Sequence, residues 1–157
     1  MNLTIRMAEA GDAETIARFN NGIAEETEGH SLDPAIIGSG VKRLLADPDN
    51  GQYWVAETDG QIVGQIMVTY EWSDWRDGRI WWIQSVYVDA EYRRKGVFAS
   101  LYRHVQDLAK KDPDAIGIRL YVDSDNARAQ DTYVNLGMQM TAYRVMETMF
   151  DQDRKKH

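Results

Sequence analysis

The spacing of apolar residues along this chain alternates between strand-like and helix-like segments. Ile16, Phe19 and Ile23 fall on one face of a helix that is predicted to start at Asp12 and to run to about Ala24. Short runs rich in β-branched and aromatic residues are typical of strands. The predicted order is therefore β-α-α-β-β-β-α-β-α-β, with one further strand optional at the end.

Local signals place the ends of the next three helices. Asp33 and Pro34 suit the first two positions of a second helix, which ends at 47–48, where Asp precedes Pro. A third helix follows Gly96 and ends near Lys111. A fourth is predicted to be capped by Asp125 or Ser124 and to end at 136–137, with a C-terminal glycine.

The strands are predicted between these helices. Residues 52–72 form a hairpin around Asp59-Gly60, which is a strong two-residue turn signal. The remaining predicted strands are residues 3–7, 79–88, 115–122 and one or two strands within 138–150. The pattern predicts an α/β fold with helices around a mixed sheet.

Composition narrows the class of protein. The chain has 157 residues, which suits one domain, predicted over 1–150 with a loose tail at 151–157. The formal net charge of −7 argues against nucleic-acid binding and fits cationic substrates. Cysteine is absent, and His30 and His104 have no ligand partner at useful spacing, so we expect no metal. No signal peptide or membrane span is evident, which predicts a cytoplasmic protein.

The densest positive charge stands at the start of the third helix. Arg93, Arg94 and Lys95 directly precede Gly96. The first amides of a helix lack partners within it, and a glycine allows a ligand close to the backbone. The arrangement favours a polyphosphate site, although a solvated basic turn is the alternative reading. The nucleotide P-loop is excluded, because no Gly-Lys-Ser/Thr follows.

Two motifs resemble those of the GCN5-related N-acetyltransferase (GNAT) family. The first is Arg-Arg-Lys-Gly-Val-Phe at 93–98, similar to the Arg/Gln-x-x-Gly-x-Gly/Ala signature for acetyl-CoA, with the usual valine at Val88. Phe98 departs from the usual Gly or Ala. The second motif is DNARAQDTYVNLGM, with Asn126 and Tyr133 in register and Met138 in place of the usual Phe.

The resemblance implies a GNAT fold with a mixed, mostly antiparallel sheet, and acetyl-CoA as co-substrate. Amides of residues 94–99 would hold the pyrophosphate, and the backbone of 86–88 would pair with the pantetheine arm. Asn126 would bond that arm or its loop, and Tyr133 would protonate the leaving thiolate. The cofactor residues implied are Val86, Tyr87, Val88, Arg93, Arg94, Lys95, Gly96, Val97, Phe98, Ala99, Asn126 and Tyr133.

The general base is left open. Many relatives carry a glutamate on the strand before the signature, where this chain has Gln84 and Ser85. Neither ionises near neutral pH, but both can hold a water that relays a proton. The other candidates for the base are Glu25, Glu26 and Glu28, at the end of the first helix, where the resemblance places the acceptor; Glu25 and Glu28 are also predicted to contact the substrate.

The acceptor is predicted from the segment before the signature. Its aromatic and acidic turn resembles the spermidine/spermine N-acetyltransferase branch, which places Trp72, Asp74 and Trp75 near an amine. The predicted function is acetyl transfer from acetyl-CoA to a primary amine of a small molecule. The alternatives are a protein or peptide N-acetyltransferase and an inactive acyl-CoA sensor. The resemblance also suggests a homodimer.

Overall fold

The computed structural model describes residues 1–150, so the predicted tail at 151–157 lies outside the described residues. The chain divides into two compact units, Met1–Arg119 and a second that begins at Leu120. The strands are β1 (Thr4–Met7), β2 (Gln52–Thr58), β3 (Gln61–Ser73), β4 (Gly78–Val88) and β5 (Ala115–Leu120). The helices are α1 (Ala13–Glu28), α2 (Pro34–Ala46), α3 (Val97–Lys111) and α4 (Ala127–Asn135), with short 3₁₀ turns at Ala10–Asp12 and Ala90–Tyr92.

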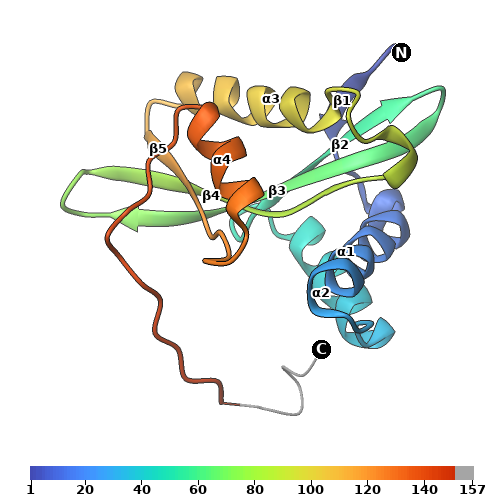
Figure 1. The fold of residues 1–157 in the computed structure, drawn as a ribbon, viewed down its shortest axis with the longest axis horizontal. Helices are drawn as coiled ribbons and strands as arrows, with labels where there is room; N and C mark the ends of the chain where they lie inside the picture. The colour runs from blue at the N-terminus through green and yellow to red at the C-terminus, as the bar shows by residue number, and fades with distance from the viewer. Residues whose placement is uncertain (151–157) are drawn as a thin grey trace. The chain divides into compact units, whose positions relative to one another are not determined.

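The five strands form one sheet in the order β1-β2-β3-β4-β5. The first four are antiparallel to their neighbours, and β5 runs parallel to β4. Helices α1 and α2 lie against one face of β2–β4, and α3 lies against the other (Figure 1). The predicted α/β fold with a mostly antiparallel sheet is confirmed.

Both faces of the sheet are closed by apolar side chains. Ile16, Val41 and Val55 belong to a buried cluster beneath α1 and α2. On the opposite face, a Cβ on Gly64 would stand 3.0 Å from Val97 Cγ1, so the glycine lets α3 approach β3 closely. Leu101 of the same helix is fully buried.

The predicted ends of α2 and α3 are confirmed. Asp33 accepts a hydrogen bond from the Ala35 amide at 2.9 Å, and Pro34 occupies the first helical position. Helix α1 runs farther than predicted: it continues through Gly22 to Glu28 and ends at Gly29. That glycine adopts φ 77° and donates to the carbonyls of Ala24 and Glu25.

Two predictions about the second unit are corrected. Asn126 caps α4, with its side chain accepting from the Ala129 amide at 3.0 Å, in place of Asp125 or Ser124. Residues 138–150 contain no strand within the described part of the chain, although strands were predicted there. Residues 138–150 contain side chains that favour a strand. A strand also needs a neighbouring strand that pairs with its backbone N–H and C=O groups.

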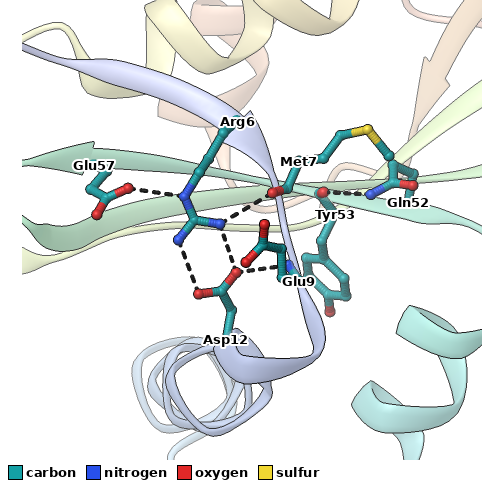
Figure 2. A network of polar contacts seen from close by, with 7 residues as sticks. All are labelled: Arg6, Met7, Glu9, Asp12, Gln52, Tyr53 and Glu57. Atoms are coloured by element: carbon teal, nitrogen blue, oxygen red, sulfur yellow. Dashed lines mark hydrogen bonds and ion pairs between the residues drawn. The ribbon is translucent and has the colours of Figure 1, made fainter.

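A cluster of charged groups ties β1 to the start of α1 and to β2 (Figure 2). Arg6 donates to both carboxylate oxygens of Asp12, at 2.8 and 3.0 Å, and to Glu57 at 2.9 Å. Asp12 also accepts from the Glu9 amide at 2.7 Å. The Arg6 side chain holds the pKa of Asp12 below its usual value.

An Asp12→Asn variant is expected to be less stable than the wild type at pH 7 by about 1–2 kcal/mol, because it loses a charged, bidentate contact that is partly screened by solvent. The lowered pKa means that this stabilisation is present above the unfolded pKa of Asp12 and is lost as pH falls through the folded pKa. Urea titrations of both proteins at pH 7 and pH 3 measure the effect. A difference of the same size at both pH values would contradict the assignment.

Candidate functional site

The backbone of the loop between β4 and α3 leaves room for a ligand to come close to it. This basic loop, residues 93–96, contains Arg94 at φ 63° and Gly96 at φ 82°, both in the left-handed region. A left-handed arginine costs about 1–2 kcal/mol. A Cβ added to Gly96 would meet no atom within 4 Å, so the space beside this position is open.

The start of α3 presents backbone donors at this loop. The first backbone bond to its N-cap runs from the Ser100 amide to the Gly96 carbonyl at 3.0 Å. The amides of Val97 and Ala99 precede Ser100 and have no acceptor inside the helix. Together with the helix dipole, they form a site suited to an anion.

Arg93 is held by the protein itself. Its guanidinium donates to Glu26 at 2.9 Å and to the Val88 carbonyl at 2.9 Å, and it lies 5.3 Å from the centroid of the Tyr87 ring. The Tyr87 hydroxyl donates to the same glutamate at 2.9 Å. Arg93 holds the pKa of Glu26 below its usual value, while burial, followed by the nearby Glu26, raises the pKa of Tyr87. The contact between Arg93 and Glu26 holds the basic loop against α1. Arg94 and Lys95 are then the cations of the loop that are more available to a ligand.

Strand β4 contains an irregularity before the basic loop. Met67 pairs with Gln84, whereas Gln65 pairs with Tyr87, so β4 has one more residue than β3 between these pairs. Ser85 lies in the extra length with φ 51°, in the left-handed region. The bulge bends the strand and leaves backbone groups outside the regular ladder.

A buried polar network lies beside this bulge. Its members, called here the floor network, are Asn20, Tyr53, Gln65 and Ser85. The Asn20 amide donates to the Tyr53 hydroxyl at 2.9 Å, and Gln65 donates to Asn20 Oδ1 and to the Ser85 carbonyl, both at 3.0 Å. Tyr53 is 2% exposed, and burial raises its pKa, so its hydroxyl stays protonated at neutral pH.

A cleft of about 370 Å³ opens above the floor network, between α1 and α2. Asn20, Tyr53 and Ser85 line it, together with Thr27 and Glu28 from the last turn of α1. The apolar side chains of its wall are Ile23, Leu32, Ile37, Val41, Leu44 and Met67. We call it the α1/α2 cleft. An apolar wall with a few polar groups is typical of a small-molecule site.

The residues predicted to bind the acceptor lie in two separate parts of the structure. Glu28 lines the α1/α2 cleft, and Glu25 lies nearby on α1, where its carboxylate accepts from Asn21 and Ser31. Trp72 lies near the end of β3, and Asp74 and Trp75 lie in the turn between β3 and β4; none of these three residues is among those lining the cleft. Trp75 is 96% exposed.

The two predicted base positions differ in their surroundings. Ser85 lines the cleft, whereas the Gln84 amide donates to Thr69 Oγ1 at 2.6 Å. Gln84 pairs with Met67 and Thr69 with Trp82, so this hydrogen bond is a diagonal contact between neighbouring antiparallel strands. Ser85 is therefore the candidate with access to a small molecule.

The second unit carries Asn126 and Tyr133 on α4. The Asn126 side chain caps this helix. Tyr133 lies near the end of the same helix and is half-buried. Among residues 1–150, no group of three His, Asp or Glu side chains is arranged to hold a metal ion. No helix in that range is long and apolar enough to cross a membrane.

Sequence reasoning missed most of the floor network. Asn20, Tyr53 and Gln65 were not predicted, because hydrogen bonds across 33 and 45 residues leave no local pattern. A signal did exist for Asn20 and Gln65. Asn20 follows Ile16 by four positions on the buried face of α1, and Gln65 stands between Val63 and Met67 in a strand of alternating side chains.

The comparisons with known proteins decide the family. A model of the family described as "Acetyltransferase (GNAT) family" matches residues 16–138. The chain belongs to this family. The family is a class of acetyl-CoA-dependent N-acetyltransferases, and its members use acetyl-CoA as co-substrate.

Solved structures agree with the GNAT fold. A structure from Clostridium difficile 630, described as a possible acetyltransferase, is 46% identical, has a TM-score of 0.91, and is matched over 96% of this chain and 99% of its own. Glucosamine-6-phosphate N-acetyltransferase from Arabidopsis thaliana is 19% identical and has a TM-score of 0.71. The match covers 96% of this chain and 100% of the plant chain. At this identity, the similarity shows the fold alone.

Thialysine N-epsilon-acetyltransferase from Bos taurus is a curated relative, 33% identical over 78 residues. The match covers 50% of this GNAT chain and 45% of the bovine protein, so it spans about half of each.

Proposed function

We propose that this GNAT protein transfers an acetyl group from acetyl-CoA to the primary amine of a small molecule bound in the α1/α2 cleft. One observation carries the proposal. The cleft reaches Ser85 at the bulge of β4, and the same strand continues to Val88 and, after the 3₁₀ turn at Ala90–Tyr92, into the basic loop at the start of α3. A phosphate-binding loop and an acceptor cleft are thereby connected by one short strand.

The basic loop fits the phosphates of acetyl-CoA. The space beside Gly96 admits a ligand, and the amides of residues 94–99 with the side chains of Arg94 and Lys95 supply donors and positive charge. We assign backbone groups of Val86, Tyr87 and Val88 to the pantetheine arm, as the family motif implies. Arg93 acts by holding the loop, since its guanidinium bonds Glu26 and the Val88 carbonyl.

Acetyl-CoA supplies an activated thioester. The nitrogen of a neutral amine forms the new C–N bond, and the C–S bond breaks. One proton leaves the nitrogen, and we assign Ser85 to hold the water that accepts it, with Gln84 as the second candidate. One proton must reach the departing sulfur, and the family motif assigns its donation to the Tyr133 hydroxyl.

The curated relative supports a small-molecule amine as acceptor. The bovine relative's name specifies the Nε of thialysine, a small-molecule amine, which favours a small amine here as well. Roles for Glu25, Glu28, Trp72, Asp74 and Trp75 at the acceptor remain predictions. A homodimer, a cytoplasmic location and a single domain over 1–150 also remain predictions.

Calorimetry with acetyl-CoA, followed by coenzyme A release with a panel of amines, tests the proposal. We expect micromolar affinity for acetyl-CoA and thiol release with at least one small amine. Absence of acetyl-CoA binding would contradict the whole proposal. Release with peptides alone would identify a protein acetyltransferase, and binding without release from any amine would identify a sensor.

A further inference from the structure

The hydrogen bonds of the floor network can run in only one direction. The carbonyl of Ser85 accepts hydrogen bonds and never donates them, so the Gln65 side chain must face it with Nε2, at 3.0 Å. The same Nε2 donates to Asn20 Oδ1 at 3.0 Å. Asn20 and Gln65 are only 7% and 0% exposed, so solvent offers them few other partners. The backbone at the bulge of β4 therefore decides how these two buried amides are oriented.

This orientation makes the Tyr53 hydroxyl a donor toward Ser85. Because Asn20 Oδ1 faces Gln65, Asn20 Nδ2 faces Tyr53 and donates to its hydroxyl oxygen at 2.9 Å. The hydroxyl oxygen is then used as an acceptor, and its own proton is left for a second partner. Burial raises the pKa of Tyr53, and hydrogen bonds with Asn20 and with the Ser85 side chain offset part of that rise. The second partner of the Tyr53 hydroxyl is therefore Ser85 Oγ.

We propose that Tyr53 is a positioning residue, which donates to Ser85 Oγ and thereby turns the proton of the Ser85 hydroxyl into the α1/α2 cleft. Tyr53 and Ser85 both line that cleft. This inference rests on the proposed function, in which Ser85 holds the water that takes the proton of the amine. A Ser85 hydroxyl that donates to this water leaves another lone pair of the water oxygen to face the amine. Tyr53 keeps its own proton throughout.

A double-mutant cycle tests whether Tyr53 acts through Ser85. It compares the wild type with Tyr53→Phe, Ser85→Ala and the double variant, using the acceptor that the amine panel identifies. Tyr53→Phe should lower kcat about tenfold, the effect of one hydrogen bond, while calorimetry should show unchanged affinity for acetyl-CoA. In the Ser85→Ala background, the same change should lower kcat less than about twofold, because the group that Tyr53 positions is already gone.

Asn20→Asp tests the direction of the hydrogen bond while the Tyr53 hydroxyl is kept. The new side chain has nearly the same shape, and its carboxylate only accepts hydrogen bonds. Gln65 can still donate to it, but Tyr53 would turn its proton toward residue 20 and away from Ser85. We expect kcat to fall about tenfold when Ser85 is present and less than about twofold in the Ser85→Ala background. If one of the variants at 20 and 53 does not fold, the other still decides the question.

Tyr102→Phe is the matched control for the loss of a buried hydroxyl. Tyr102 lies on α3, which covers the opposite face of the sheet, and it is 4% exposed, close to the 2% of Tyr53. Its hydroxyl has no assigned role in the reaction. Tyr102→Phe should therefore leave kcat and the affinity for acetyl-CoA unchanged.

The possible outcomes separate the inference from the function on which it rests. Equal losses of kcat from Tyr53→Phe with and without the Ser85 hydroxyl would mean that Tyr53 supports the fold and does not act through Ser85, which overturns the inference and leaves the transferase proposal standing. Wild-type kcat in Asn20→Asp overturns it in the same way. If the wild type binds no acetyl-CoA or releases no coenzyme A with any acceptor, the proposed function fails, before any variant is compared, and the inference fails with it. Losses in both variants that depend on Ser85 support the inference.

Discussion

A Gly96→Asp variant is expected to bind acetyl-CoA about 100-fold more weakly than the wild type, which corresponds to about 2.7 kcal/mol. The new carboxylate would stand at the start of α3, where the structure has open space beside a left-handed residue. There it would repel the phosphates that we assign to this loop. Aspartate tolerates the left-handed region better than most residues, so the fold should persist. Titration calorimetry with acetyl-CoA measures the change.

Gly60→Asp provides a matched control for this experiment. Gly60 has φ 75° in the turn between β2 and β3, and a Cβ there also meets no atom within 4 Å. The control variant therefore introduces the same residue and a similar backbone strain at a position without an assigned ligand. It should retain wild-type affinity. Equal losses in both variants would mean that strain, and not charge at the basic loop, accounts for the effect.

Replacing Tyr133 with phenylalanine is expected to lower kcat about 100-fold, because a positioned general acid contributes about 10²–10⁴ to the rate. KM for acetyl-CoA should change little, since the ring that remains can still pack. Steady-state kinetics over a range of pH values checks both parameters.

Tyr143→Phe is the comparison for this variant. Tyr143 lies in the same unit and is 82% exposed, and it has no assigned role, so its loss should leave kcat unchanged. If Tyr133→Phe retains full kcat, another group donates the proton to sulfur, and the role that the motif assigns to Tyr133 is wrong.

The parts of the fold that depend on local signals were predicted well from the sequence. Asp33-Pro34 begins α2, and Asp59-Gly60 makes the β2–β3 turn with both residues at positive φ, because these preferences are decided within a few residues. The extent of α1 was underestimated, since its last turn lacks apolar residues and is decided by Gly29. Strands at 138–150 were predicted from composition, but pairing depends on a neighbour that composition does not specify.

The candidate site, like the fold, was predicted from the sequence only where its signals are local. The basic loop was found because its cations, glycine and helix are contiguous in the chain. The floor network was not, because Asn20, Tyr53 and Gln65 come from three separate elements and meet only through the fold. Asn20 and Gln65 are polar residues on buried faces of their own elements, but nothing local shows which partners they meet, and the site forms only through their packing.

The bulge in β4 also constrains how this chain can change in length. Gln84 and Tyr87 are three residues apart, yet both pair with residues of β3 that share a sheet face. Deleting one residue between them would restore a regular ladder in which Tyr87 still lies opposite Gln65 and still faces Phe19 and Glu26. A chain one residue shorter between Gln84 and Tyr87 should therefore keep the contacts of Tyr87, whereas the loss of a second residue would turn Tyr87 to the opposite face of the sheet.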